Sequence, residues 1–350
     1  MSWKPNFDYS NKNMNFYKVG CNFDPRLIDV AVELNKKYKG KSQIVEFFGS
    51  DASNEAVTAR PGWRLPDIDK EFFANYVKKL KDNNIAFNYT MNSIQPYGSK
   101  IEMLNHKKDI QDLVKWLENI GVYRITVANP MMALFIREVS DINIEVSCIA
   151  HIDAVTQIKY WHEVLGADKF CGNLMKNRNK KFLEIAQKYC DENGMIQEVL
   201  CNEFCYVAGE SNSIAYAAPC TFRDSCYLCH ACNKTKEDSM SYNNYPMGYC
   251  MSARSSTPEA WLRMRWIRPE DQKIYREKTG VNYFKLSGRT GTTEYLEYIM
   301  NAYMSETYDG NLLGLWKPLS SIYDGKTELK SKTDIDIPNK KLDGFINKWM

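Results

Sequence analysis

One pattern recurs between about residues 16 and 200 and constrains the fold more than any other feature. A short apolar run rich in β-forming residues is followed by a polar turn and an amphipathic helical stretch. This alternation predicts parallel strands joined by crossover helices. The predicted strands span 17–21, 43–48, 85–90, 124–128, 144–150, 169–171 and 196–201. The helices expected between them span 24–38, 67–82, 107–120, 130–139, 153–165 and 177–192.

The pattern breaks at Asn202, where a long stretch rich in Cys, Tyr, Asn and Ser begins. Irregular segments of this length usually have a function. After it we expect a helix over 258–266, an eighth strand over 282–287 and a helix over 292–305. The chain is therefore predicted to be an α/β protein, a (β/α)8 TIM-like barrel at 1–325 with a cysteine-rich insertion at 202–265. The C-terminal tail spans 326–350, and its lysine-rich part, Lys326 to Lys341, is expected to be a loose surface segment.

Composition and charge narrow the function classes. The 350 residues are 44% hydrophobic and 25% charged, which is typical of a globular protein. A net charge of +3 gives no sign of a broad nucleic-acid-binding surface. The N-terminus shows no apolar signal segment, and no run is long enough to span a membrane, so a cytoplasmic location is expected. In such a chain, eleven cysteines favour metal ligation or redox chemistry over disulfides.

The densest group of cysteines lies in the insertion. The run C-Y-L-C-H-A-C places Cys226, Cys229 and Cys232 at two-residue gaps, a spacing that lets thiolates converge on one centre. A paired CxxC zinc ribbon is absent, and the insertion would lie at the functional end of the barrel, so an iron-sulfur centre is favoured over zinc. Buried free cysteines are the remaining alternative. The candidate ligands are four among Cys205, Cys226, Cys229, Cys232 and Cys250, with Cys201 and Cys220 as further candidates.

Polar residues at the predicted strand ends form a candidate substrate site, because these ends build the active sites of such barrels. His151, Glu46 and Glu203 are the candidate catalytic groups, and for His151 a simple strand-end hydrogen bond is an equal alternative. Amides at this end would suit a polar substrate, although asparagine is also a common turn and cap residue. The candidate substrate-binding amides are Asn88, Asn92, Asn129, Asn173 and Asn202.

Lys285 and Arg289 flank the exit of the eighth strand, where barrels of this kind often bind an anion. We therefore expect an anionic group of the substrate here, with a salt bridge to Glu203 or Glu270 as the alternative. Arg268 and Asp271 are expected to brace the insertion. An aromatic substrate could stack on exposed aromatic side chains, which otherwise would pack a loop onto the barrel. These aromatic candidates are Tyr242, Tyr245, Tyr249 and Trp266.

Several phrases resemble the collagenase-like peptidases, family 32 of the peptidases of unknown mechanism. These phrases are I-V-E-F-F-G-S, F-N-Y-T-M-N-S, G-V-Y-R-I-T-V-A-N-P, E-V-L-C-N-E-F-C, R-W-I-R-P-E-D and F-K-L-S-G-R. They keep the family's order and cover about residues 16 to 315. The residues themselves contain neither H-E-x-x-H nor G-x-S-x-G, two common motifs of hydrolytic sites.

The resemblance implies a redox function as readily as proteolysis. The superfamily includes oxygen-independent hydroxylases of ubiquinone precursors and RNA bases, which hold a 4Fe-4S cluster on four cysteines and for which prephenate is implicated as oxygen donor. Cys205 and Cys250 match cluster positions of the family, whereas Gly209 stands where a second cysteine would be expected. The resemblance thus implies a hydroxylase-like enzyme, with a partner subunit of the same family as a further expectation. A metal-dependent peptidase and a non-catalytic scaffold with a structural metal are the alternatives.

Overall fold

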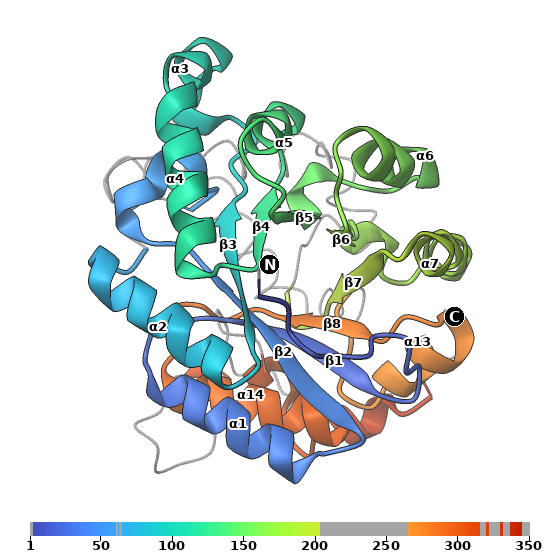
Figure 1. Cartoon of the computed structure of the whole chain (residues 1–350). Coiled ribbons are helices and arrows are strands. Elements are labelled where there is room, and N and C mark those ends of the chain that lie inside the picture. Colours follow the sequence, from blue (N-terminus) through green and yellow to red (C-terminus); the bar gives the residue numbers. More distant parts are fainter. Residues whose placement is uncertain are drawn as a thin grey trace.

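The chain folds into a closed barrel of eight parallel strands surrounded by helices (Figure 1). The computed structural model describes residues 3–60, 62, 65–203, 265–315, 320–321, 330–331 and 337–344. Each strand pairs with the next along the chain, and β8 pairs with β1 to close the barrel. The strands are β1 (Asn15–Gly20), β2 (Ser42–Gly49), β3 (Ala86–Met91), β4 (Arg124–Val127), β5 (Asn143–Val146), β6 (Lys169–Cys171), β7 (Ile196–Leu200) and β8 (Tyr283–Leu286).

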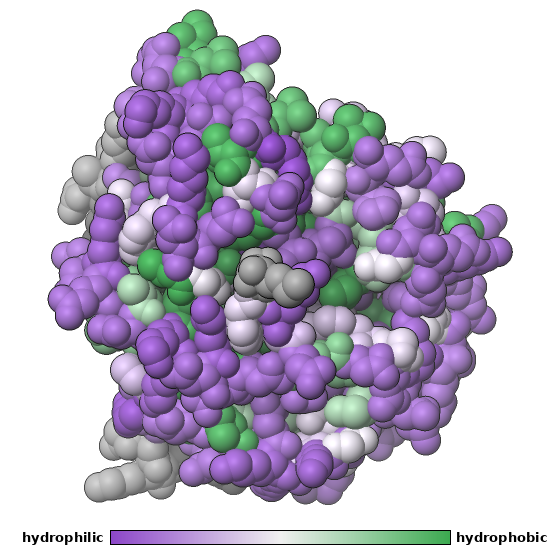
Figure 2. Space-filling model, in the orientation of Figure 1, coloured by the Kyte–Doolittle hydropathy of each residue, from purple (hydrophilic) through white to green (hydrophobic). Residues whose placement is uncertain are grey.

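The helices form an outer ring around the strands (Figure 1). They are α1 (Arg26–Lys37), α2 (Lys70–Asp82), α3 (Lys100–Asn105), α4 (Lys107–Ile120), α5 (Pro130–Arg137), α6 (Val155–Lys159), α7 (Lys180–Asn193), α13 (Gln272–Thr279) and α14 (Thr293–Ser305). The face drawn in Figure 2 is largely hydrophilic, with hydrophobic atoms gathered over α3, where Ile101 and Leu104 are exposed. Among the helices described, none is long and apolar enough to cross a membrane.

The predicted fold class and all eight predicted strands are confirmed. Two helices, α3 and α13, were not predicted. The α13 sequence, QKIYREKT, is strongly polar and buries only Gln272, Tyr275 and Thr279, so its apolar spacing is too weak to identify a helix. The helix predicted at 258–266 and most of the insertion at 202–265 lie outside the described residues.

The expectation of a loose tail is wrong for its described part at 337–344. Ile337 and Asn339 are buried, and the Asn339 side-chain amide donates to Glu270 and to the Tyr308 carbonyl, both at 2.8 Å. Arg268 forms a bidentate pair with Asp271 at 2.7 and 2.9 Å and donates to the Asn339 carbonyl at 2.9 Å. The Arg268–Asp271 pair therefore braces the C-terminal segment against the barrel.

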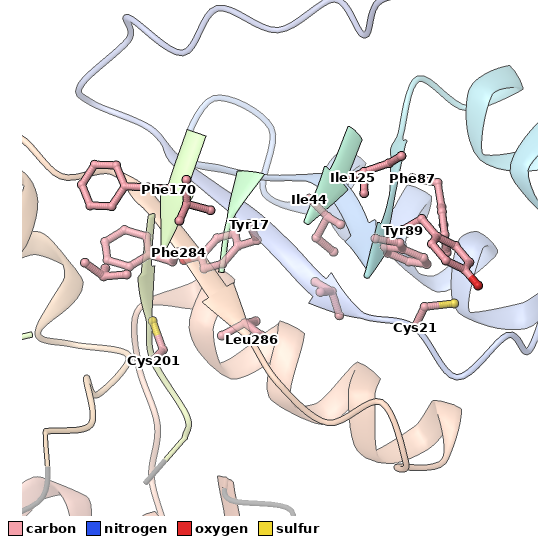
Figure 3. Packing of buried hydrophobic residues seen from close by; sticks show 14 of the residues in the cluster. Tyr17, Cys21, Ile44, Phe87, Tyr89, Ile125, Phe170, Cys201, Phe284 and Leu286 are labelled. Carbon is pink, nitrogen blue, oxygen red and sulfur yellow. The ribbon is translucent and has the colours of Figure 1, made fainter. Parts of the chain in front are cut away.

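Outward-facing strand residues form the main hydrophobic core between the barrel and the helices. Because side chains alternate along a strand, every second residue faces the helix ring. Figure 3 shows Tyr17, Ile44, Phe87, Ile125 and Phe284 from five strands in this cluster. All five are at most 1% exposed, so the burial of apolar area here supplies much of the driving force for folding.

The inward-facing residues begin with an aromatic layer at the N-terminal end of the barrel. Phe16, Val45 and Tyr283 form a buried cluster, against which Phe7 and Tyr9 from the N-terminal segment pack. A register shift pairs Tyr17 with Ile44 and Lys18 with Glu46, which leaves Val45 as an extra residue in β2. This bulge explains why Val45 and Glu46, although adjacent in sequence, both contribute to the barrel interior.

A layer of charged side chains lies above the aromatic layer, and we call it the ion-pair layer. Lys169 lies 2.8 Å from Glu46, 3.2 Å from Glu145 and 2.7 Å from Glu198. Lys18 pairs with Glu145 and, at 2.9 Å, with Glu198. Arg124 lies 3.2 Å from Glu46. Each of these side chains is at most 1% exposed, so every charge depends on its partners rather than on water.

Neutral side chains also contact the carboxylates of the ion-pair layer, and the cations of the layer keep Glu145 ionised. Asn88 donates to Glu46 at 2.6 Å and to Glu145 at 2.8 Å, and the Tyr283 hydroxyl donates to Glu46 at 2.6 Å. Burial raises the pKa of Glu145, but Lys169 and Lys18 outweigh it and lower this pKa to about 2. Glu145 therefore stabilises the fold at neutral pH, and this contribution is lost as the pH falls from about 4.5 towards 2.

Removal of Lys169 should be severely destabilising. We predict that Lys169→Met lowers the free energy of unfolding by about 3–5 kcal/mol, because it leaves buried carboxylates without their shared cation. Urea denaturation followed by circular dichroism measures this loss. The control is Lys78→Met, which breaks an exposed pair with Asp82 and should cost less than about 0.5 kcal/mol. Equal losses in the two variants would contradict a structural role for the ion-pair layer.

Candidate functional site

The carboxyl ends of the strands form the candidate site, which we call the mouth. Above the ion-pair layer, the inward side of the barrel carries Phe48 from β2, Thr90 from β3, Cys171 from β6 and Lys285 from β8. In barrels of this architecture, the loops after the strands at this end hold the reacting groups. Below the mouth, the side chains of the ion-pair layer fill the barrel of the described residues.

Phe48 is surrounded by positive charge. The ammonium of Lys285 lies 4.5 Å from the centroid of its ring, that of Lys18 lies 5.2 Å away, and the Arg289 guanidinium carbon lies 5.3 Å away. The negative face of an aromatic ring attracts cations at such distances. Lys285 also lies 4.0 Å from Glu198, and thus links the mouth to the ion-pair layer.

Arg289 reaches the mouth because two glycines give it room. Gly288 has a φ of 139°, which side-chain-bearing residues rarely adopt. A Cβ on Gly20, at the end of β1, would lie 2.9 Å from the Arg289 Cγ atom. The Arg289 guanidinium donates to the Thr90 hydroxyl at 3.1 Å. A guanidinium from β8 is therefore held across the barrel, next to β3.

Arg60 was missed by the sequence analysis and adds positive charge at Arg289. Burial lowers the pKa of Arg289 well below its ordinary value, and the charge of Arg60 lowers it further, while Glu203 acts in the opposite direction. Arg60 lies in the long connection between β2 and α2, far from Arg289 in sequence. The positive charge at Arg289 is thus unfavourable in the ligand-free protein, and an anion bound there would relieve it.

Two predicted site residues lie deeper than expected. Glu46 and Asn88 were placed at strand ends, but both lie within their strands and belong to the ion-pair layer. Glu46 is 1% exposed and pairs with Arg124 and Lys169. Although burial raises the pKa of Glu46, the charges of Lys169 and Arg124 hold it below its ordinary value, so Glu46 is an ionised structural group.

Four other predicted amides have cap or bridging roles. Asn129 caps α5 by accepting from the Met131 N–H at 2.9 Å, and Asn173 caps a short turn by accepting from Met175 at 3.1 Å. The remaining two join loops at the mouth. Asn202 donates to the Ser287 carbonyl at 3.0 Å, and Asn92 donates to the Ser147 hydroxyl at 3.2 Å. These contacts favour the turn and cap interpretation of the asparagines.

His151 and Glu203 do follow strands at this end, as expected. His151 has a φ of 57° and ends the short turn Cys148–Ala150 after β5. Glu203 lies after β7, and its charge favours the protonated form of Arg289. Neither observation shows a catalytic role for His151 or Glu203, so both assignments remain predictions. The His106 ring lies 2.8 Å from Asp109, just before α4, and the His162 ring lies 2.8 Å from the Ala167 carbonyl, in the helical turn after α6.

Of the predicted metal ligands, Cys201 is described by the structure. It is fully buried in the core outside the barrel (Figure 3) and therefore fits a packing role better than ligation at the mouth. Among the described residues, no group of three His, Cys, Asp or Glu side chains could hold a metal ion. The other candidates lie outside these residues, namely Cys205, Cys220, Cys226, Cys229, Cys232 and Cys250.

The aromatic stacking hypothesis fails for Trp266. This side chain is 1% exposed, and the Arg178 guanidinium carbon lies 5.1 Å from the centroid of its ring. Trp266 therefore packs in the protein interior and offers no surface for a planar ligand. The other candidates, Tyr242, Tyr245 and Tyr249, lie outside the described residues.

Comparison with known proteins supports the family resemblance. The chain is 27% identical to an uncharacterized protease of Methanocaldococcus jannaschii over 326 residues, which cover 91% of this chain and 85% of that protein. This relative supports the resemblance of the chain to the collagenase-like peptidases. No family model matches it.

Solved structures give weaker likenesses. The structure of a U32 peptidase shares 15% identity, covers 82% of this chain and 99% of its own, and has a TM-score of 0.46. A GH113 β-1,4-mannanase shares 8% identity, covers 84% of this chain and 99% of its own, and has a TM-score of 0.41.

The cap role of Asn129 gives a direct test. We predict that Asn129→Ala lowers the free energy of unfolding by about 1 kcal/mol, since the first turn of α5 loses its side-chain acceptor. Asn129→Ser should restore most of this loss, because serine is also a good cap. Thermal unfolding of both variants checks the expectation. An unchanged stability in Asn129→Ala would show that the hydrogen bond to Met131 does not support α5.

Proposed function

We propose that this chain is a peptidase-type enzyme that binds a carboxylate of its substrate at the mouth of the barrel. The observation that carries this proposal is the convergence of Arg289, Arg60 and Lys285 at one end of a barrel whose interior is otherwise charge-balanced. A peptide is the substrate class suggested by the name of the archaeal relative, which is called a protease.

The geometry supports recognition of a planar anion. The guanidinium of Arg289 offers several N–H donors in one plane, and its position is fixed by Thr90 and by the ring of Phe48. A carboxylate can accept two of these donors at once, which a point charge cannot match. Phosphate shares this chemistry, but a peptide carries a carboxylate at its C-terminus and on acidic side chains, in agreement with the protease relative.

An iron-sulfur-dependent hydroxylase is the second candidate function. The cysteine run at Cys226, Cys229 and Cys232 supports it, together with the match of Cys205 and Cys250 to cluster positions of the family. If a 4Fe-4S cluster is held by these thiolates, it would supply electron transfer near the mouth. Prephenate, the oxygen donor that the resemblance implies, carries carboxylates that Arg289 and Lys285 would suit, and zinc remains the alternative metal.

The carboxylate site is tested by Arg289→Lys, which keeps the charge but removes the planar donor set. On fluorogenic peptides with a free C-terminus, we expect kcat/KM to fall by a factor of about 5 to 150, which corresponds to about 1–3 kcal/mol. The matched control is Arg26→Lys, which changes an exposed arginine paired with Asp24 and Glu294 and should have no effect.

Amidated peptides complete this experiment. If Arg289 binds the C-terminal carboxylate, amidation should impair the wild-type enzyme, and Arg289→Lys should add little further loss. An equal loss on free and amidated peptides would rule out that contact. If the wild-type protein cleaves none of these peptides, the peptidase proposal itself is wrong. Loss of thermal stability in Arg289→Lys would instead identify Arg289 as a structural residue.

The second candidate is tested by metal analysis of anaerobically purified protein. We predict that Cys205→Ser and Cys250→Ser each lose bound iron and acid-labile sulfide, because a hydroxyl is a poor ligand for soft metal centres. Cys190→Ser is the control, since Cys190 is buried in α7 and should leave the metal content unchanged. Full metal retention in both ligand variants would refute the assignment, and zinc without sulfide would favour the structural alternative.

A further inference from the structure

Two cysteines outside the predicted ligand set meet at the mouth. Cys148 follows β5 and Cys171 ends β6, and both belong to a small buried cluster with Leu174, Leu200 and Met175. Both thiols are free. Val146 and Phe170 are the last paired residues of β5 and β6. Cys148 lies two residues after Val146, and Cys171 lies one residue after Phe170. The two side chains share this cluster, and their thiols are close enough to hydrogen-bond to each other.

The two thiols differ in exposure. Cys148 is partly exposed at the mouth, whereas Cys171 is fully buried beneath it. A small disulfide arriving from solvent would therefore meet Cys148 first. Cys171, buried beneath, is then placed to attack the Cys148 sulfur of the mixed disulfide. This is the arrangement that thiol–disulfide exchange requires, with one attacking thiol and one resolving thiol.

The surroundings also separate the two protonation states. A hydrogen bond from the Cys171 thiol lowers the pKa of Cys148 to about 6, with help from Lys285 and Lys18 and against the effect of burial. The same hydrogen bond and burial raise the pKa of Cys171 well above its ordinary value. These shifts favour the thiolate at Cys148 and the protonated thiol at Cys171, which matches the order set by exposure.

We propose that Cys148 and Cys171 form a redox-active dithiol that exchanges with small or peptide disulfides at the mouth. The Cys148 thiolate attacks one sulfur of the disulfide RSSR, so a mixed disulfide forms and RS⁻ leaves. Cys171 then gives its proton to the departed RS⁻ and attacks the Cys148 sulfur, which releases a second RS⁻. The dithiol is oxidised by two electrons, and RSSR is reduced to one RSH and one RS⁻.

This activity is independent of the proposed peptidase and cluster functions. It uses cysteines that neither function needs, and it requires a disulfide as co-reactant rather than a hydrolysable bond or a metal. Lys285 is the group common to both sites. It contributes positive charge to the carboxylate site and stabilises the Cys148 thiolate.

The first test uses the wild-type protein, so it does not depend on the folding of a variant. The protein is alkylated briefly with iodoacetamide between pH 5 and 8, and the extent of reaction at each cysteine is measured by peptide mass spectrometry. We expect Cys148 to react fastest, with half of its maximal rate near pH 6. Cys21 and Cys190 serve as internal controls, because burial raises the pKa of both. A Cys148 rate no higher than theirs would overturn the proposal.

The second test follows exchange with oxidised glutathione. Wild-type protein should yield a Cys148–Cys171 disulfide, while Cys171→Ala should stop at the mixed disulfide between Cys148 and glutathione. In Cys171→Ala, the half-maximal alkylation of Cys148 should also move to higher pH, because the thiol donor is lost. Cys190→Ala is the control and should behave as wild type. Absence of the Cys148–Cys171 link in oxidised wild-type protein would refute the dithiol, whatever the outcome of the peptide and metal experiments.

Discussion

The charges sealed inside the barrel are the constraint on which the rest of the structure depends. Lys18, Lys169 and Arg124 can remain ionised in the interior because carboxylates from other strands of the barrel face them within 3.2 Å or less. Each ion pair joins side chains from two different strands. The pairs therefore favour one order and one register of the strands, the one in which every buried charge has its partner. A one-residue slip of any of these strands would move its charge into the apolar core under the helices. The bulge at Val45 supports the same pairing, because it turns the Glu46 side chain towards the barrel interior.

The ion-pair layer also determines where a ligand can bind. Below it, Phe16, Val45 and Tyr283 fill the barrel, and above it the side chains become polar, thiol-bearing or cationic. Lys285 lies 4.0 Å from Glu198 and also faces the mouth, so its charge is only partly compensated from below. Arg289 has no counterpart within the ion-pair layer and lies close to Arg60. Positive charge therefore increases from the balanced interior towards the mouth, which favours anionic ligands and stabilises a thiolate there.

The sequence predicts the fold well and the site only in part, for physical reasons. Strand and helix periods are local, so eight strands could be located within a few residues from their apolar alternation. Ion pairs and thiol pairs are not local. Lys18 and Glu145 are 127 residues apart, and nothing in either strand shows that they meet. In the sequence, Glu46 and Asn88 are polar residues near predicted strand ends, where catalytic residues of such barrels are found. The strand register shows instead that both belong to the ion-pair layer. Asparagine is ambiguous for a different reason. The same side chain suits both substrate binding and helix capping, and at Asn129 it caps a helix.

The proposed anion site and the proposed dithiol share the positive charge of Lys285. Lys285 favours the thiolate of Cys148 and lies over the ring of Phe48, on which Arg289 also packs. An anion bound at Arg289 and Lys285 would compensate part of the charge that stabilises the thiolate, so it should raise the pKa of Cys148. Oxidation of Cys148 also removes the thiolate and should therefore strengthen anion binding, and by linkage a bound anion should favour the oxidised dithiol by the free energy that oxidation adds to anion binding. If both proposals hold, the shared charge of Lys285 is sufficient to couple anion binding at the mouth to the redox state of the dithiol.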